Sequence, residues 1–196
     1  MALIGVDTYA YHRLLGDVRE GEAASRDRLP DWFAAGAAAG VVLAVENHAD
    51  LRAAQLARLG ERIGSPRLAV CFDTANAVRV GDDVLAAADL LAPRIVMAHV
   101  KDVRPDGWRD RSGPVSVPLG AGVLPVRRVV ERLRSGGAGA ASGGLDLWLL
   151  VEFGHLGDRD VGERALVRAD LRQLRAWEKE VSGPLFRSEQ GLEKGS

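Results

Sequence analysis

The chain has 196 residues, a length that predicts one domain with a buried core. Apolar residues make up 47% and charged residues 27%, which excludes the composition of a disordered chain. A formal net charge of -1 excludes the broad basic surface of a nucleic-acid-binding or membrane-surface protein, so we expect neither partner. The single cysteine, Cys71, excludes an internal disulfide framework and predicts a reducing, cytoplasmic setting.

The N-terminal segment predicts no export signal, because it lacks a basic region followed by a long apolar one. The longest uncharged run, Trp32 to Val45, is shorter than the ~20 residues that cross a bilayer. We therefore assign this run to the core and expect no membrane partner.

Short runs rich in Val, Ile and Leu alternate with stretches of helical spacing, which is typical of βαβ units and a parallel sheet. The predicted strands are Leu3–Tyr9, Val41–Asn47, Arg67–Asp73, Arg94–Val100 and Leu145–Phe153. The predicted helices are Asp50–Ile63, Asp82–Leu91, Pro125–Arg134 and Asp160–Val181, with Asp50 and Asp82 as N-cap candidates. The fold class is α/β.

Three segments interrupt this alternation. Leu14–Pro30 is polar without periodicity, Arg104–Pro125 is predicted as a long loop rich in Gly and Pro, and Ser135–Gly144 is a flexible Gly/Ala/Ser insertion. We expect one domain over residues 1–181 and a flexible tail over 182–196.

Polar side chains follow each predicted strand, at the edge of a parallel sheet where ligands bind. Four strands end in the sequences Glu46-Asn-His48, Asp73-Thr-Ala-Asn76, His99-Val-Lys101-Asp102 and Glu152-Phe-Gly-His155. With His12 beyond the first strand, all four histidines lie at or just after a strand end. Any one of these residues alone is more often a solvated rim group or a helix cap, but the set predicts a shared site.

Three carboxylates and one imidazole, Glu46, Asp73, His99 and Glu152, would repel one another unless a divalent cation neutralised them. Oxygen-rich ligation suits Mn²⁺, with Mg²⁺ or Co²⁺ as alternatives. Strand periodicity requires small or apolar residues two positions earlier, and these are Ala44, Cys71, Met97 and Leu150. Cys71 is accordingly assigned to the core, because no basic partner lies near it in the sequence.

These motifs, together with Val-Pro118-Leu-Gly120-Ala-Gly122, occur in the same order as the site motifs of a known family, and they cover Gly40 to Phe153 plus Gly5 to Leu15. The chain resembles the xylose isomerase-like sugar phosphate isomerases and epimerases. The resemblance implies a (β/α)8 TIM barrel with one divalent metal, held here by Glu46, Asp73, His99 and Glu152.

The motifs resemble those of the first and the last four strands of that barrel, so we expect an incomplete barrel without strands two to four. Because the first and eighth strands of a closed barrel adjoin, Leu3–Tyr9 should lie beside the last strand. Its outer edge and that of Val41–Asn47 would be unpaired, and Ala44, Cys71, Met97 and Leu150 would be exposed. We therefore expect a homo-oligomer, or a cover formed by Leu14–Pro30 and the helix that follows.

The resemblance implies a metal-dependent sugar or sugar phosphate isomerase or epimerase. Glu46 and Glu152 would act as acid and base through a metal-stabilised enediolate. The residues assigned to substrate binding are His12, His48, Asn76 and Lys101, and Asn76 stands where sugar epimerases often have histidine. Lyase, dehydratase or C-glycoside-cleaving chemistry needs the same proton abstraction and stays open, as does a non-catalytic barrel remnant.

Overall fold

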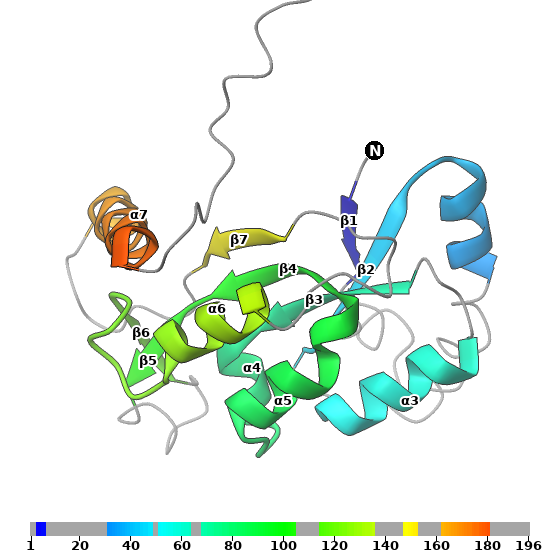
Figure 1. Ribbon diagram of the computed structural model, residues 1–196, viewed down its shortest axis with the longest axis horizontal. Helices are drawn as coiled ribbons and strands as arrows, with labels where there is room; N and C mark the ends of the chain where they lie inside the picture. Colours follow the sequence, from blue (N-terminus) through cyan, green and yellow to red (C-terminus); the bar gives the residue numbers. More distant parts are fainter. Residues whose placement is uncertain are drawn as a thin grey trace, which may run out of the picture.

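A parallel five-stranded sheet is the centre of the molecule (Figure 1). The computed structural model describes residues 3–6, 31–48, 51–63, 68–104, 114–135, 147–152 and 162–180. The sheet has the order β1-β2-β3-β4-β7, with strands β1 (Leu3–Val6), β2 (Val42–Glu46), β3 (Leu68–Asp73), β4 (Ile95–Val100) and β7 (Trp148–Val151). The five predicted strands and the α/β class are thereby confirmed.

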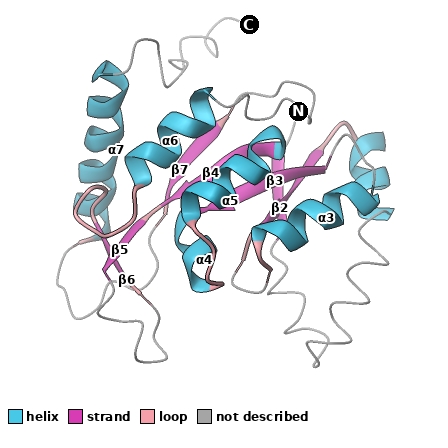
Figure 2. Cartoon of the chain, turned by 60° about the horizontal axis from the view of Figure 1, so that its bottom comes forward, coloured by secondary structure: helices cyan, strands magenta, loops and turns pink. Residues whose placement is uncertain are grey.

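Helices cover one face of this sheet, as they do on the outside of a barrel. They are α3 (Ala53–Ile63), α4 (Thr74–Arg79), α5 (Val84–Leu91), α6 (Val126–Ser135) and α7 (Glu163–Glu180), together with a helix over residues 31–38 and a short 3-10 turn, η1 (Ala92–Arg94). Figure 2 shows α3, α5 and α6 side by side over the strands. Among the described residues, no helix is long and apolar enough to cross a membrane.

The two faces of the sheet differ because strand residues alternate with a period of two. On the helix-covered face, Val45, Val70, Phe72 and Ala98 join the main hydrophobic core with side chains of α3, α5, α6 and α7. On the opposite face a smaller cluster contains Val42, Ala44, Ala69, Cys71 and Val96, with Met97 packed against it. The candidate site residues lie on this same face, further along the strands than the smaller cluster.

The position of β1 differs from the prediction. It pairs in parallel with β2, Leu3 opposite Val42, and not with the last strand. Strands that follow each other in sequence pair with each other in most sheets, and a helix over residues 31–38 precedes β2 in the described part of the chain. The edge strands are therefore β1 and β7, so the prediction of Val41–Asn47 as an edge is wrong.

The predicted exposed patch is only partly present. Ala44 and Cys71 are 0% and 1% exposed, whereas Met97 is half-buried and Leu150 is 37% exposed. Ala44 and Cys71 are short side chains set among Val42, Ala69, Val96 and Met97, which explains their burial. Since β1 and β7 each have one unpaired edge within the described residues, the homo-oligomer stays a prediction.

Local details correct three further expectations. Asp83, not Asp82, caps α5, and Asp82 instead accepts a hydrogen bond from the Ala53 N–H at the start of α3. The segment predicted as a long loop includes a strand, β6 (Val115–Val117), which pairs antiparallel with β5 (Asp102–Arg104). Helix α4 was not predicted, because its six residues are too few to show a helical period. Asp50, residues 182–196, all of Leu14–Pro30 and all of Ser135–Gly144 except Ser135 lie outside the described residues.

Candidate metal centre

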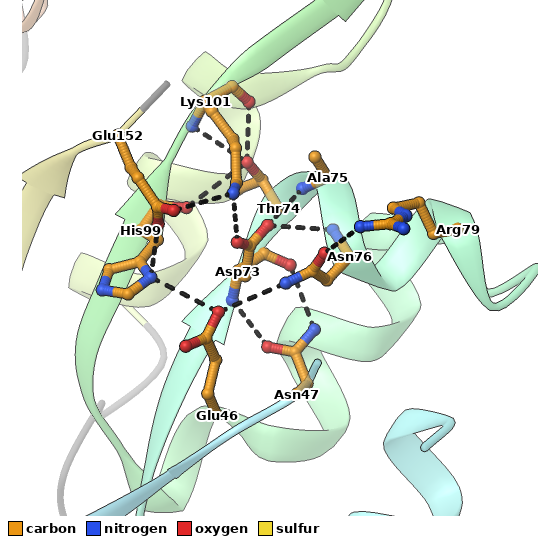
Figure 3. Close-up of polar contacts among 10 residues, drawn as sticks. All are labelled: Glu46, Asn47, Asp73, Thr74, Ala75, Asn76, Arg79, His99, Lys101 and Glu152. Carbon is orange, nitrogen blue, oxygen red and sulfur yellow. Dashed lines mark hydrogen bonds and ion pairs between the residues drawn. The ribbon is translucent and has the colours of Figure 1, made fainter. Parts of the chain in front are cut away.

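Four neighbouring strands each bring one candidate ligand to the same end of the sheet, where the carboxyl ends of the strands lie. Glu46 ends β2, Asp73 ends β3, His99 lies on β4 and Glu152 directly follows β7. The parallel register pairs Asp73 with His99, so their side chains leave the sheet on the same face. One ligand atom from each of these four residues lies within 4.8 Å of the others (Figure 3).

Asp73 is fixed by the helix that it begins. Its Oδ1 accepts hydrogen bonds from the N–H groups of Ala75 and Asn76 at 2.8 and 2.9 Å, as the N-cap of α4. This leaves Oδ2 directed to the site, 2.6 Å from the Lys101 Nζ. Burial raises the pKa of this fully buried carboxyl, against the opposing effect of Lys101.

His99 is held between two glutamates. Its Nδ1 lies 2.6 Å from Glu152 Oε2 and 3.5 Å from Glu46 Oε1. Burial disfavours the imidazolium, but contacts with Cys71, Glu152 and Glu46 outweigh it and raise the pKa of His99 to about 12. The bond to His99, with the Lys101 charge, outweighs burial and lowers the pKa of Glu152 to about 2. Without a metal, the imidazolium is thus the counter-ion of both glutamates.

Lys101 is a second internal cation. Its side chain is 10% exposed, and its Nζ lies 2.6 Å from Asp73 Oδ2 and 3.2 Å from Glu152 Oε1. Burial opposes its charge, yet the two carboxylates raise the pKa of Lys101 overall. The three carboxylates of the cluster carry three negative charges, and Lys101 supplies one positive charge. A divalent cation, with His99 neutral, would balance the other two.

Two side chains that the sequence analysis did not identify, Asn47 and Thr74, extend the strand pairing beyond the strand ends. Each acts as a clamp, which here means a side chain with two hydrogen bonds to the backbone of the neighbouring strand's end. The buried Asn47 amide accepts from the Asp73 N–H at 2.6 Å and donates to the Asp73 carbonyl at 3.0 Å. The Thr74 hydroxyl donates to the Lys101 carbonyl at 2.7 Å and accepts from its N–H at 3.1 Å. Both residues directly follow a strand-ending carboxylate, and that spacing is the signal that could have identified them.

Asp102 holds the turn that follows β6. Its fully buried carboxylate accepts hydrogen bonds from the N–H groups of Val103, Gly120, Gly122 and Leu124. A Cβ at Gly122 would collide with this carboxylate, so the close approach requires glycine there. The Gly120-Ala-Gly122 motif therefore has a structural role beside the site.

The residues assigned to substrate binding have different outcomes. Asn76 is in the site, where its amide donates to Glu46 Oε1 at 3.2 Å. Lys101 is in the site, but as the ion-pair partner of Asp73 and Glu152. His48 is half-buried two residues beyond Glu46 and is not one of the four candidate ligands, and His12 lies outside the described residues.

The donor atoms suit a divalent cation. Asp73 Oδ2, His99 Nδ1 and Glu152 Oε2 are buried without a hydrogen bond of good geometry, and their short contacts are ion pairs. Buried polar atoms normally have a hydrogen-bond partner, so three such atoms converging in one cluster suggest a further ligand. Three carboxylates and one imidazole form a donor set that fits Mn²⁺, Mg²⁺ or a similar cation.

The family follows from comparison with known proteins. The xylose isomerase-like TIM barrel model matches residues 6–175, and the chain belongs to this family. A curated relative, the 2-epi-5-epi-valiolone 7-phosphate 2-epimerase of an Actinoplanes species, is 38% identical over 139 residues, which are 70% of this chain and 45% of that protein.

Solved structures share the fold. The probable 3-DHS dehydratase AsbF of Bacillus anthracis has a TM-score of 0.65 at 14% identity and covers 88% of this chain. The IOLI protein with a bound zinc atom has a TM-score of 0.62 at 17% identity and covers 84% of this chain. The chain spans 63% and 59% of these two structures and about half of the curated relative, which agrees with an incomplete barrel.

Proposed function

We propose that the chain is a divalent-metal-dependent epimerase or isomerase of a sugar or sugar phosphate. The observation that carries this proposal is the convergence of four candidate ligands from four adjacent strands, with three of their donor atoms buried in ion pairs that lack good hydrogen-bond geometry. The curated relative, which is named as a 2-epimerase of 2-epi-5-epi-valiolone 7-phosphate, supports a phosphorylated substrate and an epimerisation.

Glu46, Asp73, His99 and Glu152 are the proposed ligands, and Mn²⁺ is the proposed ion. A bound divalent ion would polarise a substrate carbonyl and so acidify the neighbouring C–H. The chain's part is to hold that carbon near a base. Asp73 and His99 lie on the two central strands, β3 and β4, and mainly fix the geometry.

Glu46 and Glu152 are the proposed acid and base. They come from β2 and β7, on opposite sides of β3 and β4, and both approach the His99 Nδ1 from those sides. One carboxylate would remove the proton, and the other would return a proton to the opposite face of the same carbon, which is an epimerisation. Asn76 holds Glu46 in position for these transfers.

The substrate's hydroxyl and phosphate groups are assigned to Asn76, Lys101, His48 and His12. The support is strongest for Lys101, whose ammonium group is already in the site and would be released toward an anion once a metal ion took its place between Asp73 and Glu152. The relative's phosphorylated substrate supports an anionic group in this position.

Calorimetric titration of chelator-treated protein with Mn²⁺ tests the metal site. We expect one ion per chain, and at least about tenfold weaker binding for Asp73→Asn, which keeps the N-cap acceptor but removes the charge. Asp89→Asn, which changes an exposed carboxylate on α5, should bind Mn²⁺ as the wild type does. Equal binding by Asp73→Asn and wild type would contradict the ligand assignment.

Proton exchange tests the reaction. Mn²⁺-loaded protein in D₂O is incubated with phosphorylated and unphosphorylated ketoses and followed by NMR. We expect deuterium at the carbon beside the carbonyl, and loss of this exchange in Glu152→Gln but not in Asp89→Asn. Loss of water from the substrate would point to the dehydratase alternative, and no exchange with any ketose would favour the non-catalytic remnant.

A further inference from the structure

On the face of the sheet opposite the helices, a second group of donor atoms lies next to the candidate metal centre, deeper in the molecule. In the parallel register Glu46 on β2 lies opposite Cys71 on β3, and two residues further along β3 Asp73 lies opposite His99 on β4. Cys71 is a free thiol, 1% exposed, two residues before Asp73 on the same face of β3. One ligand atom each from Glu46, Cys71 and His99 lies within 4.8 Å of the other two.

We propose that Cys71, Glu46 and His99 form a second ligand set, which binds a thiophilic divalent cation such as Zn²⁺ or Cd²⁺. This inference rests on the proposed metal centre for its two shared ligands, Glu46 and His99. Because the two sets share two of their ligands, we treat them as alternatives. One chain therefore holds one ion, and the chemistry of that ion decides which set it uses.

The chemistry of the donors separates the two sets. Binding at the deeper set exchanges the S–H bond of Cys71 for a sulfur-metal bond and releases the proton to solvent. A thiolate is a soft ligand that selects Zn²⁺ and Cd²⁺, whereas carboxylates suit Mn²⁺ and Mg²⁺. The cysteine therefore adds an affinity for thiophilic ions that the carboxylate set alone would not give.

Charge and the position of Lys101 favour this deeper set for a thiophilic ion. A divalent ion is neutralised by the Glu46 carboxylate and the Cys71 thiolate, with neutral His99 as the third ligand. The Lys101 Nζ can then stay 2.6 Å from Asp73 Oδ2. The carboxylate set, in contrast, needs Asp73 Oδ2 for the ion and must displace Lys101. Occupying the deeper set thus leaves one buried ion pair intact.

Two variants separate the ligand sets in opposite directions. Cd²⁺ and Mn²⁺ are titrated separately into chelator-treated wild type, Cys71→Ala and Asp73→Asn. We expect Cys71→Ala to weaken Cd²⁺ binding at least about tenfold while Mn²⁺ binding is kept, and Asp73→Asn to do the reverse. Cd²⁺ should also give a thiolate-to-metal charge-transfer band in wild type and Asp73→Asn, and none in Cys71→Ala.

A measurement on the wild type keeps the proposal falsifiable if Cys71→Ala fails to fold. The ¹¹³Cd NMR shift of the loaded protein should report one sulfur ligand, and added Mn²⁺ should displace the Cd²⁺ competitively. A cadmium shift typical of oxygen and nitrogen ligands alone, or equal Cd²⁺ binding by a folded Cys71→Ala, would overturn this inference while the carboxylate site stands. Absence of Mn²⁺ binding by the wild type would instead overturn the proposed function.

Discussion

Strands β3 and β7 each deliver one carboxylate to the same cluster, but from contrasting surroundings. Every residue of β3 is buried, and Asp73 at its end is 0% exposed. Strand β7 lies at the sheet edge, where Leu150 is 37% exposed and the Glu152 side chain is 40% exposed. Asp73 is held by two backbone N–H groups and Lys101, whereas the Glu152 carboxylate contacts the side chains of His99 and Lys101.

We infer from this difference that Asp73 has a fixed, positioning role and that Glu152 is the carboxylate that can move. A carboxylate that caps a helix cannot leave its place without breaking the start of α4, so Asp73 suits a fixed ligand. A half-exposed carboxylate at an open edge can change its rotamer at low cost, which suits a proton-transferring group. The pKa shifts have different causes, because burial raises the pKa of Asp73 while the ion pair with His99 lowers the pKa of Glu152 to about 2.

The largest expected contrast is in stability. Asp73→Ala removes the N-cap and leaves Lys101 buried beside one remaining carboxylate, which we expect to cost about 3–5 kcal/mol. Glu152→Ala should cost less than about 1 kcal/mol, because its side chain is partly solvated. Urea unfolding of both variants in chelator gives the two values, and equal losses would contradict the contrast.

Double-mutant cycles at Lys101 sharpen the comparison. The coupling of Lys101→Met with Asp73→Asn should be about 1–3 kcal/mol, because that pair is buried and only 2.6 Å apart. The coupling of Lys101→Met with Glu152→Gln should be below about 1 kcal/mol. A larger coupling to Glu152 than to Asp73 would reverse the assignment of the fixed and mobile partners.

Removing one of the side-chain clamps should reduce the free energy of unfolding less than removing a charge that the clamps position. Thr74→Val removes a hydroxyl that bonds both backbone groups of Lys101, and we expect a loss of about 1–2 kcal/mol. Ser135→Ala is the matched control, since its exposed hydroxyl bonds to carbonyls within α6 and should matter by less than about 0.5 kcal/mol. Thermal unfolding compares the two, and a neutral Thr74→Val would exclude a clamp role.

The last expected effect is the pH dependence of the metal-free protein. The pKa of Glu152 falls from 4.5 to about 2, so its contribution to stability is complete above pH 4.5 and is lost as pH falls toward 2. The pKa of His99 rises from 6.5 to about 12, so its contribution is complete below pH 6.5 and declines as pH rises.

Both contributions are therefore complete between pH 4.5 and 6.5. Unfolding midpoints measured across this range and on either side, in the presence of chelator, check the effect. Glu152→Gln should flatten the decline on the acid side, and an unchanged acid decline in that variant would assign it to other carboxyl groups.

Hydrophobic runs and strand-end residues predicted much of this arrangement. The period-two pattern placed Glu46, Asp73, His99 and Glu152 on one face, and the structure brings their ligand atoms together. It also placed Cys71 below them, but its neighbour His99 is distant in sequence, so the thiol's surroundings were not apparent.

The position of β1 and the surroundings of Lys101 could not be predicted from local patterns. Pairing of β1 with β2 depends on contacts across the sheet, and periodicity within a strand does not specify its neighbour. Lys101 follows β4 like a rim residue, and only the fold shows that it bridges Asp73 and Glu152. Asp82 and Asp83 are adjacent, so a cap motif alone could not choose between them.

Crystals of the Mn²⁺-loaded protein, measured at the manganese absorption edge, test the central claim most directly. We predict one anomalous difference peak, bonded to Glu46, Asp73, His99 and Glu152, with the Lys101 ammonium group displaced from Asp73 Oδ2. No peak at this cluster in loaded crystals, with Lys101 still bridging Asp73 and Glu152, would contradict the account.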